Sequence, residues 1–177
     1  MQTMALRMRR KGIQVFIIAP LKGHEFYRAA RNVGGEFIQI SPASKNCINI
    51  MEIRKVDNSV NELLDGPTLD ASALAGKIQR LHIFFSLLIP DMSHEEKQLL
   101  DEALIKTYAR KGITHKNESL TDPQHPEQYK KMPILEDVYN VLLESEDTKR
   151  LAHILNRLVH GSASSFNQQT NVDLTNK

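Results

Sequence analysis

The sequence contains few of the residues that mark specialised classes of protein. It has one cysteine, Cys47, no tryptophan, 8 glycines and 7 prolines among 177 residues. A single cysteine excludes an internal disulfide and favours an intracellular protein. The low glycine and proline content excludes collagen-like and low-complexity chains. The longest largely apolar run, residues 83–89, which contains one serine, is far shorter than the roughly 20 residues of a membrane-spanning helix. We therefore expect a globular chain without a membrane span.

The net charge is small, but the two signs are unevenly distributed. The chain carries 23 Lys and Arg against 21 Asp and Glu, a formal charge of +2. Residues 1–55 hold 10 basic and 3 acidic side chains, whereas residues 56–177 hold 13 basic and 18 acidic ones. The total does not argue for a nucleic-acid partner. The basic cluster Arg7, Arg9, Arg10 and Lys11 is either a solvated helix face or a surface that meets phosphates.

The first third of the chain has the pattern of a parallel α/β unit. Residues 13–19 form a β-branched apolar run that ends at Pro20, which is typical of a strand buried on both faces. Residues 24–33 have helical periodicity, and residues 36–40 alternate between apolar and polar. With a short helix over residues 4–11, this predicts one strand–helix–strand unit with parallel strands.

From about Asp57 onward, helical periodicity replaces the strand signals. A capping-box sequence begins at Ser93 and predicts a helix that ends at Gly112. Residues 114–132 are polar and contain two prolines, which predicts an exposed loop. One further strand start is possible at Val172. The predicted helices cover residues 72–90, 93–112, 133–142 and 147–161.

Several kinds of site are absent from the sequence. No GxxxxGK[ST] string is present, and Gly76-Lys77, the only Gly-Lys pair, lies within a predicted helix. His153 and His160 are seven residues apart and do not have the spacing of a zinc site. We therefore expect neither a complete phosphate-binding loop nor a bound metal.

Glu25 is the candidate catalytic residue. It follows the predicted strand over residues 13–19, at the sheet edge where ligands of open α/β folds bind. The alternative is that Glu25 stabilises the dipole of the helix that it begins. The residues alone leave both interpretations open.

Several separated strings resemble one family when taken in order. They are residues 15–20 (VFIIAP), 23–26 (GHEF), 34–38 (GGEFI), 41–49 (SPASKNCIN), 99–108 and 161–174. They resemble the motor domain of type IV secretion and conjugation ATPases. This is the TraE/TrbE/CagE group, or VirB-four class, within the FtsK/HerA set of hexameric P-loop motors. The resemblance covers nearly the whole chain.

The resemblance implies an α/β fold: a partial RecA-like parallel sheet, as in a fragment of a P-loop NTPase, with an inserted all-α subdomain. Residues 1–57 would form part of the nucleotide-binding core, residues 58–160 the helical subdomain, and residues 161–177 the return toward the core. The family's Walker A and Walker B motifs fall outside the sequence. We therefore expect ATP and Mg²⁺ to be held by the intact parent, and this chain to be inactive alone.

One functional position of the family maps onto this chain. It is Glu25, which the resemblance implies would orient or polarise the attacking water. Many relatives have Asp-Pro where this chain has Ala19-Pro20, which weakens a role shared between two acids. Four polar residues are candidates to approach nucleotide or a neighbouring subunit, without an assigned role: Asn46, Asn49, Gln169 and Asn171.

The resemblance implies a hexameric ATPase that powers conjugative DNA transfer or type IV secretion. Its expected partners are other subunits of the same ATPase, the secretion channel and coupling proteins, with DNA contacted only indirectly. Its expected location is the cytoplasm, at the inner face of the membrane. Two alternatives remain: a non-catalytic helical interaction module, and a DNA-binding regulator that uses Arg9, Arg10 and Lys11. The apolar face of residues 13–19 also predicts self-association.

Overall fold

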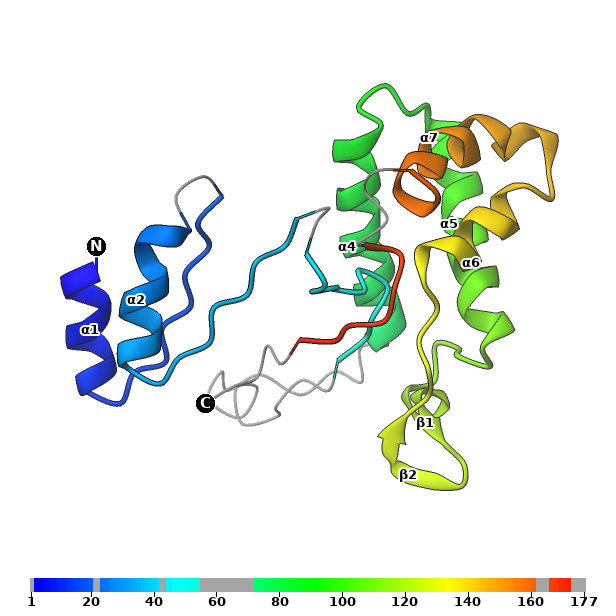
Figure 1. Cartoon of the computed structure of the whole chain (residues 1–177). Helices are drawn as coiled ribbons and strands as arrows, with labels where there is room; N and C mark the ends of the chain where they lie inside the picture. The colour runs from blue at the N-terminus through cyan, green and yellow to red at the C-terminus, as the bar shows by residue number, and fades with distance from the viewer. Residues whose placement is uncertain (1, 21–22, 42–43, 55–71, 162–165, 173–177) are drawn as a thin grey trace.

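The computed structural model describes residues 2–20, 23–41, 44–54, 72–161 and 166–172. Figure 1 shows two parts: helices α1 and α2 with two extended segments, and a helical bundle made of α4, α5, α6 and α7. Residues 36–41 lead from the first part toward the bundle. The subdomain boundary predicted at residue 57 lies outside the described residues.

Two helices form the N-terminal part, as the sequence predicts. Helix α1 (Gln2–Arg10) ends before Gly12, whose φ of +76° favours glycine. Helix α2 (His24–Asn32) packs on the extended segment that follows it, where the rings of Tyr27 and Phe37 meet edge to face at 5.3 Å. The helices α1 and α2 are in contact with each other.

The predicted parallel strands are not formed within the described residues. Residues 13–19 and 36–40 are extended but make no strand ladder. Phe16 and Ile18 are 74% and 80% exposed instead of buried. A β-strand requires a hydrogen-bonded neighbour, and α1 and α2 do not supply one. The described residues therefore do not show a RecA-like parallel sheet, and the two extended segments lie beside two helices.

Helices α4 and α5 form the centre of the bundle. Ser72 caps α4 (Ala73–Leu88), because its hydroxyl accepts a hydrogen bond from the Ala75 amide at 3.3 Å. The capping box of α5 (His94–Arg110) is present in both directions: Ser93 Oγ accepts from the Glu96 amide at 3.1 Å, and the Ser93 amide donates to Glu96 Oε2 at 2.9 Å. Their apolar faces meet in the core, which includes Leu74, Ile78, Leu81, Phe85, Leu100 and Leu104.

Two shorter helices complete the bundle. Helix α6 (Leu135–Leu142) packs on both α5 and α7 (Lys149–Val159), and the 3₁₀ turn η2 (Glu146–Thr148) joins α6 to α7. Arg150 of α7 bonds Asp91 and Glu96, each at 2.6 Å, and so ties α7 to the turn between α4 and α5. The Ser93 amide, and then Arg150, hold the pKa of Glu96 below its ordinary value.

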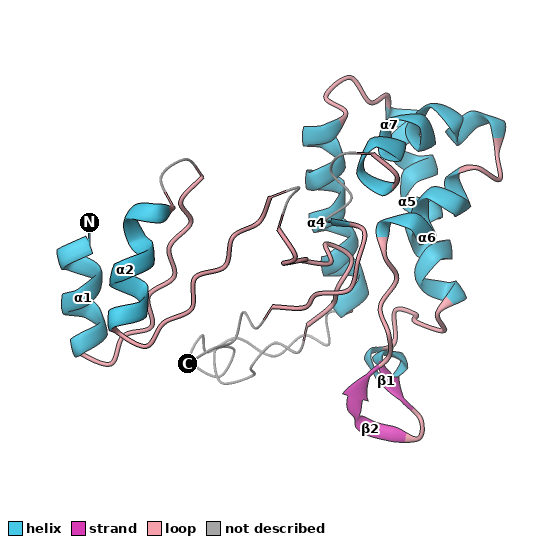
Figure 2. Cartoon of the chain, in the orientation of Figure 1, coloured by secondary structure: helices cyan, strands magenta, loops and turns pink. Residues whose placement is uncertain are grey.

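The segment predicted as a loop, residues 114–132, contains regular structure. A 3₁₀ turn η1 (Asn117–Leu120) leads into β1 (Thr121–Asp122), which pairs antiparallel with β2 (His125–Tyr129). Figure 2 shows this hairpin projecting from one end of the bundle. Asp122 Oδ1 accepts from the Gln124 amide at 2.8 Å and closes the turn around Pro123. The hairpin has no apolar strand pattern in the sequence, because its residues are mostly exposed and polar.

We expect neighbouring phenylalanines of α4 to contribute differently to stability. Phe85 is 1% exposed and Phe84 is only partly buried, so Phe85→Ala leaves a cavity and lowers the free energy of unfolding by about 3–5 kcal/mol. Phe84→Ala is the matched control and costs less. Urea unfolding followed by circular dichroism measures both, and equal losses would contradict the packing of α4.

Candidate functional site

Near its C-terminus the chain returns to the segment through which it enters the bundle. Residues 166–172 lie there beside residues 44–54. Asn171 is central to this crossing, because its Oδ1 accepts from the Cys47 amide at 2.7 Å and its Nδ2 donates to the Lys45 carbonyl at 2.7 Å. The Asn171 amide also donates to the Cys47 carbonyl at 3.2 Å. One side chain and one backbone amide therefore hold the two segments side by side.

Asn49 joins a third segment to this crossing. Its side chain is nearly inaccessible, with 2% of the residue exposed. Nδ2 donates to the Pro133 carbonyl at 2.9 Å, and Oδ1 accepts from the Met51 amide at 2.9 Å. Gln169 reaches the same place, since its Nε2 donates to the Met132 carbonyl at 2.7 Å. We call Asn49, Gln169, Thr170 and Asn171 the polar clasp.

Thr170 links the polar clasp to a charged group. Its hydroxyl accepts from the Asn49 amide at 3.0 Å and donates to Glu52 Oε2 at 2.6 Å. The same carboxylate oxygen accepts from Arg54 at 2.9 Å. The polar clasp therefore continues into an ion pair at the surface.

Lys77 of α4 lies in the electrostatic field of this group. Burial, and then the positive charge of Arg80, lower the pKa of Lys77 from 10.5 to about 8, although the negative charge of Glu52 acts in the opposite direction. A lysine held in this way has a larger neutral fraction at neutral pH than an exposed one.

The segment bound by the polar clasp is part of the bundle core. Met51 is fully buried, and its carbonyl accepts from the Tyr108 hydroxyl of α5 at 2.5 Å. Burial raises the pKa of Tyr108 above its ordinary range. The polar clasp thus fixes the path of the chain against the helices. Amide and hydroxyl side chains stay neutral near neutral pH, so the polar clasp positions the backbone and does not itself act as an acid or base.

Asn46 lies beside the polar clasp but has a different set of partners. Asn46 Nδ2 donates to the Gln39 carbonyl at 3.1 Å, and Ser44 Oγ donates to the same oxygen at 2.7 Å. These bonds hold the turn where the chain leaves the N-terminal part. Of the four polar residues singled out in the sequence, the structure brings three together in the polar clasp and places Asn46 at its entrance.

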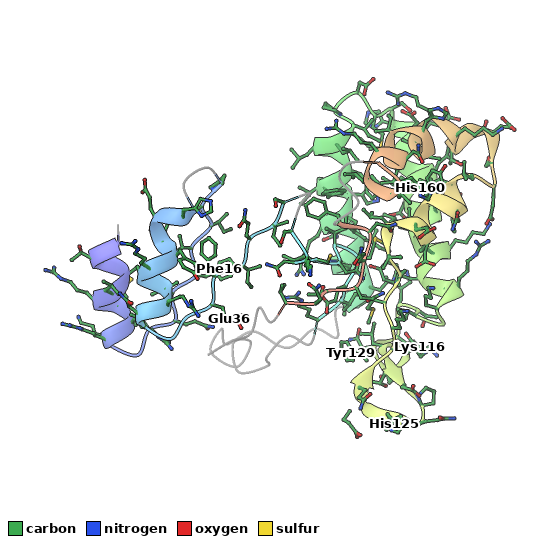
Figure 3. The ribbon with its side chains drawn as sticks, viewed as in Figure 1. Phe16, Glu36, Lys116, His125, Tyr129 and His160 are labelled. Carbon is green, nitrogen blue, oxygen red and sulfur yellow. The ribbon has the colours of Figure 1, made fainter. Side chains whose placement is uncertain are left out.

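Glu25 is located away from the polar clasp. It lies exposed in the first turn of α2. Its neighbours His24 and Phe26 line a largely apolar hollow of about 830 Å³ between α1, α2 and the extended segments. Figure 3 shows Phe16 and Glu36 of this part well separated from His160 and Lys116 of the bundle. Its catalytic role stays a prediction.

The described residues contain no group of three or more His, Cys, Asp or Glu side chains placed to hold a metal ion. Cys47 is buried, and its Sγ lies 3.4 Å from Gln168 Oε1. Within the same described residues, no helix combines the length and apolarity required to cross a bilayer.

Comparison with known proteins gives a similarity to a solved structure. Neither a family model nor a curated protein matches the chain. Among solved structures, VirB4 of Thermoanaerobacter pseudethanolicus superimposes with a TM-score of 0.74 and 26% sequence identity. The match covers 97% of this chain and 42% of that VirB4 chain.

The chain is similar to part of VirB4. This finding confirms the predicted resemblance to the VirB-four class, and the likeness extends through both the N-terminal part and the bundle. The chain spans about two-fifths of the length of the VirB4 that it matches. Its mainly helical structure with a small antiparallel hairpin agrees with a piece of the VirB4 fold.

Sequence reasoning missed two features of the site. The bond from Tyr108 to Met51 joins residues of two predicted units and had no local signal. Lys77 was noted only for its Gly-Lys context, although its position on an apolar helix next to Arg80 indicated burial near a like charge.

We expect Asn49 to be essential for the stability of the polar clasp. Asn49→Ala leaves the Pro133 carbonyl and the Met51 amide without their side-chain partners, so the free energy of unfolding falls by about 2–4 kcal/mol. Asn140→Ala, an exposed change on α6, is the control and leaves stability nearly unchanged. Urea unfolding of both variants tests this, and comparable losses would refute the role of Asn49.

We expect Lys77→Met to stabilise the protein in a pH-dependent way. Because the pKa of Lys77 is about 8 in the folded chain and 10.5 ordinarily, the unfolded chain binds more protons between these values. The buried charge therefore lowers the free energy of unfolding by its full amount below about pH 8. This loss declines as the pH approaches 10.5. The variant should exceed the parent in unfolding free energy most at pH 7 and less at pH 10. A difference that is the same at both pH values would exclude this explanation.

Proposed function

We propose that this chain is part of a VirB4-like ATPase of a type IV secretion apparatus. The observation that carries the proposal is the similarity to VirB4 over 97% of the chain at 26% identity. The ordered strings in the sequence support the same family independently of the structure. In this function the parent protein couples ATP hydrolysis to assembly of the apparatus and to substrate transfer.

More specifically, we propose that the parent ATPase works as a hexameric ring in conjugative DNA transfer. In this arrangement the secretion channel and coupling proteins are the partners, and the protein works at the cytoplasmic face of the membrane. The support is the resemblance of residues 15–49 and 161–174 to conjugation ATPases.

We propose that this chain does not hold ATP and Mg²⁺ alone. The sequence has no GxxxxGK[ST] loop, and the described residues contain no cluster of metal ligands. Nucleotide binding in the proposed function therefore depends on other parts of the parent. The contribution that we assign to this chain is Glu25, as the acid that orients the attacking water.

The extended segments, which form no strand ladder among the described residues, support a role in a larger sheet. Residues 13–19 expose Phe16 and Ile18, and they border the apolar hollow with residues 36–40. Exposed apolar extended chain is stabilised when neighbouring strands pair with it. We propose that these segments become strands of a RecA-like parallel sheet in the intact ATPase.

A second candidate function is a helical interaction module without catalysis. The bundle has its own continuous core, and α4 presents two adjacent exposed apolar residues, Ile83 at 63% and Leu87 at 78%. Such a stripe is suited to docking another protein. This candidate requires neither Glu25 nor nucleotide.

A chimera separates the two candidates. We expect ATP hydrolysis when this chain replaces the matching part of the Thermoanaerobacter VirB4, and a loss of about 100-fold or more in kcat with Glu25→Gln. Glu95→Gln is the matched control, since Glu95 is also an exposed first-turn glutamate, on α5.

ATP binding and ATP hydrolysis by the chimera test the role of Glu25 separately from the ATPase assignment. A folded, active chimera that is indifferent to Glu25→Gln would remove the catalytic assignment of Glu25. A folded chimera that binds ATP without hydrolysing it, whatever residue 25 is, would favour the interaction module.

A further inference from the structure

The N-terminal part carries a concentration of positive charge that the proposed function does not use. Its described residues, 2–20 and 23–41, contain six cations and two acids, Glu25 and Glu36. We call these six cations the N-terminal cation surface: Arg7, Arg9, Arg10, Lys11, Arg28 and Arg31. In residues 72–161, by contrast, 12 basic and 13 acidic side chains nearly balance.

None of the six cations forms a salt bridge within the described residues, whereas five cations of the bundle do. Four of the six, Arg7, Arg10, Arg28 and Arg31, are exposed arginines on the two helices. Unpaired charges of one sign on one small unit repel each other, and binding of a polyanion removes that repulsion.

The fold brings the C-terminal ends of the two helices together. Both helices run in the same direction in Figure 1, so their C-terminal ends lie side by side. Arg9 and Arg10 of α1 line a hollow of about 390 Å³ together with Asn32 of α2. Arg31 is next to Asn32, and its Nη1 donates to the Tyr27 hydroxyl at 3.1 Å, which fixes its direction. A helix dipole favours a cation in each last turn, but it does not account for Arg28 in the middle of α2.

We propose that the N-terminal cation surface binds the phosphate backbone of a nucleic acid. Five of its six cations are arginines, whose planar guanidinium groups bond phosphate oxygens in pairs. A lipid surface requires apolar side chains beside the cations. Exposed apolar residues do lie on and beside the two helices, namely Met4, Leu6, Ile13, Tyr27 and Val33, so the experiment below includes lipid vesicles as the competing ligand. This inference does not depend on ATP hydrolysis.

Binding of a fluorescein-labelled 20-nucleotide single strand, and of the matching duplex, to the 177-residue chain tests the proposal by anisotropy. We expect salt-dependent binding of at least one form, without sequence preference. Arg7→Gln with Arg10→Gln should weaken it about tenfold or more in 50 mM salt and reduce the slope of log affinity against log salt by about 1.4–1.8. Circular dichroism melting checks that the variant stays folded.

The matched control changes the same net charge elsewhere. Lys97 and Arg157 are exposed bundle cations without a salt bridge among the described residues, so Lys97→Gln with Arg157→Gln should leave affinity within about twofold. Equal weakening by both double variants would overturn the proposal, because net charge alone would then explain it. So would absence of binding at 50 mM salt, or arginine-dependent binding to phosphatidylserine vesicles without binding to either nucleic acid.

Discussion

The buried amide of Asn49 is the constraint on which the path of the chain depends. It bonds the Pro133 carbonyl and the Met51 amide, and it lies 3.4 Å from Gln169. Three segments that are distant in sequence therefore meet at one side chain that has almost no contact with solvent. An unpaired polar group there would be costly, so each of the three segments is held in a single position.

The bundle and the N-terminal part therefore differ in how they are packed. The bundle supplies a continuous apolar core. The polar clasp attaches two segments to this core: the one that enters the bundle from the N-terminal part, and the one that runs back toward that part. The N-terminal part has no comparable core, because its extended segments face a hollow. This difference supports the proposed role within a larger VirB4-like protein, in which the extended segments would join a sheet.

Local signals in the sequence predicted the helices but not the pairing between segments. The Ser93-to-Glu96 capping box and the apolar period of α4 were sufficient, because helices are stabilised by residues three and four positions apart. Residues 13–19 have the composition of a strand, yet a strand depends on a neighbour that the described residues lack. The polar clasp joins residues 124 positions apart, and the sequence indicates three of its four members, Asn49, Gln169 and Asn171, without their partners. Glu25 was found by its place after a predicted strand, and its role rests on the family resemblance.

The sequence separation in the polar clasp also has a consequence for the order of folding. Contacts between neighbouring helices such as α5, α6 and α7 close short loops. The bond between Cys47 and Asn171, by contrast, closes a loop that contains most of the chain. Contacts between distant residues carry a larger entropic cost and form later. On the ribosome, the segment around Met51 emerges before the helices against which it packs. The bundle therefore assembles first, and the clasp closes only when synthesis has passed Asn171.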